Sequence, residues 1–326
     1  MSTIAQAEKA KAAIIHRQAL VWDNHCDTLI DVTLGKRKLG AKCTGGHIDL
    51  PRLQEGGVNV QVFAIYIASP PFLRQALEFI SAFYQELAAN ENLALITSVK
   101  QIPQLSTQKK IGALLSIEGG EVLEGGPGIL PCLYQLGVRA MGLTWNWRNQ
   151  LADGVAEAGT GGGLTTLGIE TIKEMNRLGM VIDVSHLSPA GFWDVLAHSE
   201  MPFIASHSNA RKICDHPRNL DDGQIKALAA QGGIMGINFA PDFLGANADL
   251  NTVIDHIDYI ANLTGSTDCI ALGSDYDGIP ATPVGLEDVS CLPNLTAGLV
   301  ARGYQEADIT KILGGNSLRV FQEVIG

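Results

Sequence analysis

The sequence predicts a single (β/α)8 barrel, and three observations support this prediction. Eight short apolar runs rich in β-branched residues recur along the chain, each followed by a helical pattern, as expected for parallel strands joined by crossover helices. The length of 326 residues is within the usual range of one such barrel. The chain has no Gly-x-Gly-x-x-Gly motif after an early strand and no Walker A motif, which disfavours an open doubly wound sheet, the main alternative.

The predicted strands are distributed over the whole chain. They span residues 19–25, 58–67, 111–118, 138–145, 180–186, 202–207, 233–239 and 269–275. Intervening segments such as 73–92 and 250–265 carry apolar residues at three- and four-residue spacing, which is typical of helices that cover a barrel. We expect one domain over residues 1–326, with an N-terminal helix over 4–18 and C-terminal helices packed on the barrel.

Charge and composition disfavour several classes of partner. The formal net charge is -11, from 23 basic and 34 acidic residues, so the protein's field repels a phosphate backbone and we expect no nucleic-acid partner. The six cysteines show no Cys-x-x-Cys spacing, which indicates reduced thiols. No run of 18 apolar residues, secretory signal pattern or hydrophobic C-terminal tail occurs, so we expect no membrane anchor and a cytoplasmic location. No segment identifies an oligomer interface, and a homodimer stays an open alternative.

Residue types that bind metal ions recur at the C-terminal ends of the predicted strands. They are His25 and Asp27 at the first strand, Glu118 at the third, His186 and His207 at the fifth and sixth, and Asp275 at the eighth. In a (β/α)8 barrel these strand ends converge on one face, where catalytic groups lie. Residues i and i+2 of a strand point to the same side, so His25 and Asp27 can both turn toward one ion.

Each of these residues alone has a structural explanation, but the set predicts a pair of zinc ions. Single histidines are often structural, and Glu118 alone could cap a helix. Together, three imidazoles and two carboxylates are enough for two zinc ions with Glu118 as the bridge. Such a pair lowers the pKa of a shared water to about 7 and polarises a carbonyl, which predicts amide hydrolysis. Asp275 would carry the proton from water to the leaving amine; Asp277 is the alternative and also fits a turn.

With these residues identified, the sequence resembles the renal or membrane dipeptidase family, zinc hydrolases with a (β/α)8 barrel in the amidohydrolase superfamily. The similarity spans nearly the whole chain. It lies in the ordered motifs DNHCDT (23–28), IEGGE (117–121), DVSHLS (183–188), ASHSNAR (205–211), HPRNLDD (216–222), LGSDYDGIP (272–280), GLEDVS (285–290) and NSLRVF (316–321).

The resemblance implies a binuclear centre with two Zn²⁺ per chain, bridged by Glu118. The implied ligands are His25, Asp27 and Glu118 for one ion, and Glu118, His186 and His207 for the other. Asp275 is implied as the proton shuttle.

The resemblance also implies residues that bind the substrate. Arg218 matches an arginine that grips the C-terminal carboxylate of a dipeptide, a task that suits the guanidinium fork; a surface ion pair with Asp221 or Asp222 is the alternative. Well-known members carry a histidine near the scissile carbonyl, in a Thr-His-Asn context after the fourth strand, where this chain has Trp145. Stabilisation of the oxyanion would then depend more on the metals, Trp145 or Asn146.

The sequence therefore predicts a zinc-dependent dipeptidase that hydrolyses small dipeptides by attack of a metal-bridging water. Acceptance of a C-terminal D-residue is an expectation taken from the resemblance alone. Two alternatives stay open. One is another binuclear-metal amide hydrolase or tailoring enzyme on the same barrel, which Trp145 could signal. The other is a non-catalytic metal-bound binding protein, disfavoured because a structural zinc site needs neither an open coordination position nor a second acid.

Overall fold

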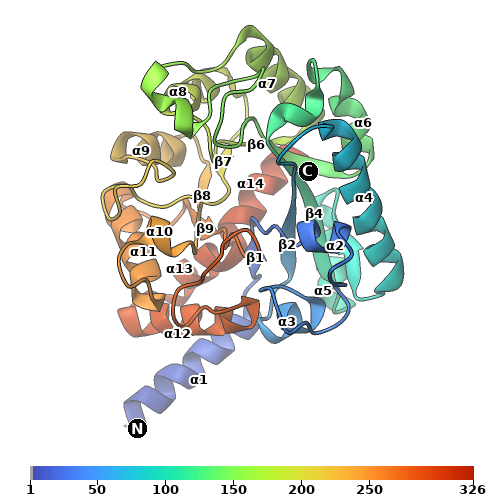
Figure 1. Ribbon diagram of the computed structural model, residues 1–326. Helices are drawn as coiled ribbons and strands as arrows, with labels where there is room; N and C mark the ends of the chain where they lie inside the picture. Colours follow the sequence, from blue (N-terminus) through green and yellow to red (C-terminus); the bar gives the residue numbers. More distant parts are fainter. Residues whose placement is uncertain (1–2) are drawn as a thin grey trace.

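The computed structural model describes residues 3–326, apart from the side chains of residues 3–6 and 106, and shows a ring of parallel strands surrounded by helices (Figure 1). The domain expected from the sequence also includes residues 1 and 2, which lie outside the described residues. The first helix projects from the barrel, and its C-terminal part packs on a late helix of the chain.

Within residues 3–326, nine parallel strands form one sheet, and eight of them close into a barrel. The order around the ring is β2-β1-β9-β8-β7-β6-β5-β4, and pairing of β2 with β4 completes the closure. The strands are β1 (Trp22–Asp23), β2 (Val60–Tyr66), β3 (Leu93–Leu95), β4 (Ile111–Glu118), β5 (Val138–Gly142), β6 (Val181–Asp183), β7 (Ile204–Ala205), β8 (Ile234–Ile237) and β9 (Ile270–Leu272). The predicted (β/α)8 barrel is confirmed, and each of the eight predicted strands contains one barrel strand.

The strand β3 was not predicted from the sequence. It pairs with the first residues of β4, from Leu93 opposite Ile111, while β5 pairs with the last residues of β4. Its three residues follow directly on a long helical pattern, and three residues are too few to show a strand periodicity. The paired parts of several barrel strands are also shorter than their apolar runs, because the chain turns out of the ladder just before the site residues.

The helices follow the strands and cover the outside of the barrel. Helix α4, for example, buries Ala76, Phe79, Ile80 and Phe83, which the helical period places on one face. The α-helices are α1 (Thr3–Gln18), α2 (Leu29–Thr33), α3 (Leu50–Glu55), α4 (Phe72–Ala89), α5 (Ile102–Thr107), α6 (Leu130–Gln135), α7 (Thr166–Leu178), α8 (Pro189–His198), α9 (Asp222–Ala230), α10 (Pro241–Leu244), α11 (Leu250–Thr264), α12 (Leu292–Arg302), α13 (Glu306–Thr310) and α14 (Asn316–Ile325).

Shorter helical turns complete the connections. They are η1 (Val99–Gln101), η2 (Gly120–Leu123), η3 (Pro127–Ile129), η4 (Val155–Thr160), η5 (Val289–Cys291) and the π-helical turn η6 (Lys311–Gly315). Within residues 3–326, no helix is both long and apolar enough to cross a membrane.

The core consists of two apolar clusters separated by the barrel wall. The larger cluster lies between strands and helices, and the smaller one fills the barrel toward the N-terminal ends of the strands. The smaller cluster is closed by α14, whose Phe321 packs on Trp22 of β1 with ring centroids 4.8 Å apart. This apolar floor leaves the C-terminal ends of the strands as the open end of the barrel.

We expect Phe321→Ala to lower the free energy of unfolding by about 3–5 kcal/mol, because it leaves a cavity in the floor of the barrel. Phe321 is fully buried. Denaturant-induced unfolding measures the loss. The neighbouring Gln322 is exposed on the same helix, so Gln322→Ala should change the free energy by less than about 0.5 kcal/mol. Equal stability of the Phe321 variant and wild type would contradict this account of the floor.

Candidate metal centre

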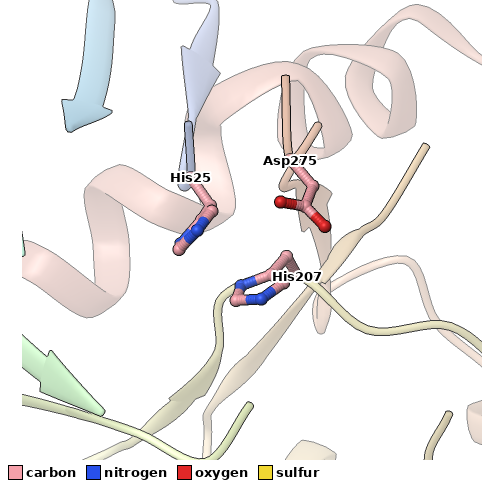
Figure 2. Close-up of side chains that lie close together, drawn as sticks. All are labelled: His25, His207 and Asp275. Atoms are coloured by element: carbon pink, nitrogen blue, oxygen red, sulfur yellow. The ribbon is translucent and has the colours of Figure 1, made fainter. Parts of the chain in front are cut away.

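The five predicted metal ligands and Asp275 meet at the C-terminal ends of the strands. Their donor atoms form three overlapping groups, and within each group the atoms lie within 4.8 Å of one another. The groups are His25, Asp27 and Glu118; Glu118, His186 and His207; and His25, His207 and Asp275. Figure 2 shows the last group, with three side chains from separate segments turned toward a common space.

Glu118 is the last residue of β4, and its two carboxylate oxygens face different histidines. Its Oε1 lies 2.8 Å from His186 Nε2 and 3.6 Å from His207 Nε2, whereas its Oε2 lies 3.5 Å from His25 Nε2. His25 Nε2 in turn lies 3.3 Å from Asp27 Oδ2. A carboxylate placed between two groups of ligands in this way can bridge two ions.

The donor atoms at the site fit metal ions better than they fit one another. His25 Nε2 and Asp27 Oδ1 are buried and form no hydrogen bond with any described residue. His186 Nε2 and His207 Nε2 face each other at 2.9 Å. Buried polar atoms without partners are costly, and imidazole nitrogens with carboxylate oxygens are a donor set that zinc and similar ions accept.

Hydrogen bonds behind two of the histidines leave their Nε2 atoms free to bind an ion. His186 Nδ1 lies 2.7 Å from Asn146 Oδ1, and His207 Nδ1 lies 2.7 Å from Ser206 Oγ. The Ser206 hydroxyl itself donates to Asp183, so its oxygen accepts the proton of His207 Nδ1. These partners place the hydrogen on Nδ1 of each ring and therefore the lone pair on Nε2.

Neighbouring histidines keep Glu118 ionised, and burial keeps two of those histidines, His186 and His207, neutral. Burial opposes ionisation of Glu118, but the charge of His25 and the hydrogen bond of His186 outweigh it and lower its pKa. Burial holds the pKa of His207 well below its usual value; burial and the charge of Arg218 lower the pKa of His186 to about 4. Neutral imidazoles need to lose no proton before they bind a metal ion.

Asp275 and Asp277, the two acids considered for proton transfer, have different surroundings. Burial raises the pKa of Asp275 to about 7, and the charges of Asp27 and Glu118 act in the same direction against that of His25. Asp275 faces His25 and His207 and accepts a hydrogen bond from Asn238 Nδ2 at 2.9 Å.

Asp277, by contrast, is engaged by the surrounding chain. Its carboxylate accepts hydrogen bonds from Thr28 Oγ1 at 2.6 Å and from the backbone N–H of His47 at 2.5 Å, and it pairs with Arg37. Both acids have positive φ, 61° for Asp275 and 69° for Asp277. The turn that carries them is therefore held in a left-handed conformation that aspartate tolerates better than most residues.

A cavity of about 330 Å³ opens onto the ligands and contains Arg218. The Arg218 side chain is 5% exposed, its Nη2 donates to the carbonyl of His207 at 3.1 Å, and its Nε has no partner among the described residues. The surface ion pair considered as an alternative is not formed: Asp221 caps α9, and Asp222 accepts a hydrogen bond from Tyr259.

Trp145 and Asn146 follow β5 and also line the cavity. Trp145 lies between Tyr66 and His186, with ring centroids 5.3 and 5.8 Å away. Asn146 uses its carbonyl oxygen to orient His186, so it acts on a ligand as well as lining the cavity.

Four residues of the site were not predicted: Tyr66, Asp183, Ser206 and Asn238. Asn238 could have been found, because it is a polar residue near the end of the apolar strand 233–239, the pattern that identified the ligands. Asp183 and Ser206 show the same pattern in the predicted strands 180–186 and 202–207, but their role behind His207 depends on contact between neighbouring strands and could not be predicted from it.

Comparisons with known proteins point to one family. The family model described as membrane dipeptidase (peptidase family M19) matches residues 9–325. An uncharacterized protein in the pqqA 5′ region of Klebsiella pneumoniae is 40% identical over 256 residues, covering 74% of this chain and 94% of that protein. Dipeptidase 3 of Mus musculus is 36% identical over 292 residues, or 86% of this chain, which spans 58% of that protein's length.

A solved structure shows the same architecture. The metallo peptidase from Rhodobacter sphaeroides, liganded with a phosphinate mimic of the dipeptide L-Ala-D-Ala, matches with a TM-score of 0.85 at 28% identity. The match covers 94% of this chain and 99% of that one.

We expect Ser206→Ala to weaken zinc binding by about 10- to 100-fold, because His207 loses the group that fixes its tautomer and orientation. Competition with a chromophoric chelator measures the affinity directly. Ser208→Ala is the matched control, since Ser208 is also buried but its hydroxyl has no hydrogen-bonding partner among the described residues. Unchanged zinc affinity in the Ser206 variant would show that the contact does not orient a ligand.

Proposed function

The chain belongs to the membrane dipeptidase family, peptidase family M19, and from this premise we propose that it is a zinc dipeptidase with two ions bridged by Glu118. Membership makes the protein a metallopeptidase, a hydrolase that acts on dipeptides, as the sequence motifs predicted. The observation that carries the finer proposal is the position of Glu118, whose two oxygens each face a different group of histidine ligands.

In the proposed hydrolysis, the metal ligands and Asp275 have different roles. These ligands would hold the zinc ions, and the ions, when bound, would supply the Lewis acidity that activates water and polarises a carbonyl. Asp275 accepts a proton from the attacking water and gives it to the amine nitrogen as the C–N bond breaks. A half-buried carboxylate beside the ligands, whose pKa is raised by desolvation, suits this exchange.

Arg218 favours a substrate with a free C-terminal carboxylate. It is buried beside the ligands, and its unpartnered Nε leaves an N–H for a carboxylate oxygen. A charge-assisted hydrogen bond deep in a cavity of about 330 Å³ favours short peptides over protein chains. The Rhodobacter structure was solved with a mimic of L-Ala-D-Ala, which supports a C-terminal D-residue as part of the proposal.

The identity of residue 145, a tryptophan, is the reason to retain a second candidate reaction. It stands where well-known members of the family carry a histidine, so a related amide hydrolysis or tailoring reaction is the second candidate. The non-catalytic binding protein considered from the sequence is set aside, because the chain belongs to a peptidase family.

The experiment that tests the proposal joins a metal count to a substrate panel. The protein is stripped with a chelator, reloaded with zinc, and assayed on L,L- and L,D-dipeptides and on N-acyl amino acids. We expect two zinc ions per chain by mass spectrometry and dipeptide turnover only after reloading. Turnover of N-acyl amino acids alone would favour the second candidate, and reloading without bound zinc would overturn the metal centre.

Asp275→Asn should lower kcat by about 100- to 10,000-fold, because the amide cannot accept the proton of the attacking water. The metal content should stay near that of wild type. Steady-state kinetics and mass spectrometry on the same preparation measure the two quantities. Loss of zinc from this variant would instead make Asp275 a ligand and its role in proton transfer wrong.

Arg218→Ala should raise KM for dipeptides with a free C-terminal carboxylate by about 10- to 100-fold, since a hydrogen bond to a charged group is lost. Dipeptide amides, which lack this carboxylate, should be affected far less. Lys212→Ala is the control, because Lys212 is an exposed cation in the same segment. An unchanged KM for free dipeptides would show that Arg218 is not a clamp for the C-terminal carboxylate.

A further inference from the structure

One side of the cavity is an apolar wall, and we propose that it selects dipeptides whose N-terminal residue has a large apolar side chain. The wall consists of Ile30 from α2, Tyr66 from the end of β2 and Trp145 after β5, all of which line the cavity. The inference rests on the proposed dipeptidase function and on the clamp at Arg218.

The strand order places the wall across the barrel from the clamp. Arg218 follows β7, and β2, which ends in Tyr66, is the fourth strand away from β7 in either direction around the ring. Tyr66 pairs in register with Glu118 on the neighbouring strand, so the wall begins directly beside the proposed bridge. Arg218, the metal centre and the wall therefore follow one another across the mouth of the barrel.

The proposed hydrolysis requires the peptide bond of the dipeptide to lie at the metal centre, which orients the dipeptide in this arrangement. An extended chain advances about 3.3–3.6 Å per residue, so a dipeptide held at its carboxylate by Arg218 reaches about 7 Å. Its one peptide bond then lies at the metal centre, and its N-terminal residue lies beyond Glu118, on the side of Tyr66. The side chain of the N-terminal residue meets the wall, whereas that of the C-terminal residue stays on the side of Arg218.

The chemistry of the wall favours apolar side chains. Trp145 packs on Tyr66 with centroids 5.3 Å apart, and Ile30 adds an aliphatic surface from a third segment. Among the described residues that line the cavity, Arg218 is the only lysine or arginine, so an acidic N-terminal side chain finds no second cation. Burial of an apolar side chain is favourable in proportion to the area removed from water.

The position of Trp145 makes this selectivity a property of the present chain. An indole presents a larger apolar surface than the imidazole that the resemblance implies for other members of the family at this position. Trp145→His therefore exchanges the wall residue for the usual family residue and tests the inference without opening a large cavity.

The test is a series of dipeptides X-Ala, in which X is Gly, Ala, Leu, Phe or Asp, assayed with the zinc-loaded full chain. We expect kcat/KM for Leu-Ala and Phe-Ala to exceed that for Gly-Ala by at least about 10-fold, with Asp-Ala lowest. Trp145→His and Trp145→Ala should reduce the ratio of Phe-Ala to Gly-Ala by about 10-fold, and Trp145→Phe should retain most of it. The ratio separates selectivity from any general loss of activity.

Trp147→Ala is the matched control. Trp147 is 60% exposed, two residues from Trp145, and is not among the residues that line the cavity. Its replacement should leave the ratio unchanged, and thermal melting of each variant verifies that the fold is retained. Equal kcat/KM for all X in the wild type, or equal losses for all X in the Trp145 variants, would overturn the inference while leaving the dipeptidase function intact.

A wild type that cleaves no dipeptide would overturn the proposed function instead, and the wall is then tested by binding. Calorimetric titration of the zinc-loaded protein with Phe-Ala and Gly-Ala gives the two Kd values. A preference for Phe-Ala that is lost in Trp145→Ala supports the wall independently, and equal Kd values overturn it.

Discussion

The site depends on the carboxylate of Glu118, which is shared between His25 on one side and His186 and His207 on the other. The sharing is possible because Glu118 ends β4 in a closed ring, so residues from both halves of the chain approach it. Burial alone would favour the neutral acid, but the charge of His25 and the hydrogen bond of His186 keep the carboxylate ionised. An ionised carboxylate beside the neutral imidazoles of His186 and His207 is a centre that attracts cations.

The ligands are held from behind by buried polar contacts rather than by apolar packing alone. Asp183 of β6 accepts the backbone N–H and the hydroxyl of Ser206, next to β7, and this serine holds His207. Asp23 of β1 accepts the same two groups from Ser274, next to β9. Each contact joins neighbouring strands just before the residues of the candidate site. The barrel thus fixes ligand orientation through the same strand pairing that closes the sheet.

Two acids after β9, Asp275 and Asp277, combine a strained backbone conformation with hydrogen bonds at the open end of the barrel. Asp275 and Asp277 both adopt a left-handed conformation, which persists only where surrounding contacts hold it. Thr28, His47 and Arg37 bind the carboxylate of Asp277 and so anchor the turn. The anchored turn presents Asp275 beside the predicted ligands, where its carboxylate accepts a hydrogen bond from Asn238. One acid of the pair stabilises the loop, and the other is left for the proton transfer that we propose.

The sequence by itself determined the barrel, its eight strands and the residues that gather at its mouth, because strand and helix periodicities are local and parallel strand ends converge in any such barrel. Its motifs also identified the family. Only the tertiary structure decided which oxygen of Glu118 faces which histidine, how Asp275 differs from Asp277, and that Trp145 forms a wall with Tyr66. The short strand β3 likewise exists only through its pairing with β4. These features depend on side chains from distant segments meeting in a particular register, and no pattern within one segment encodes that meeting.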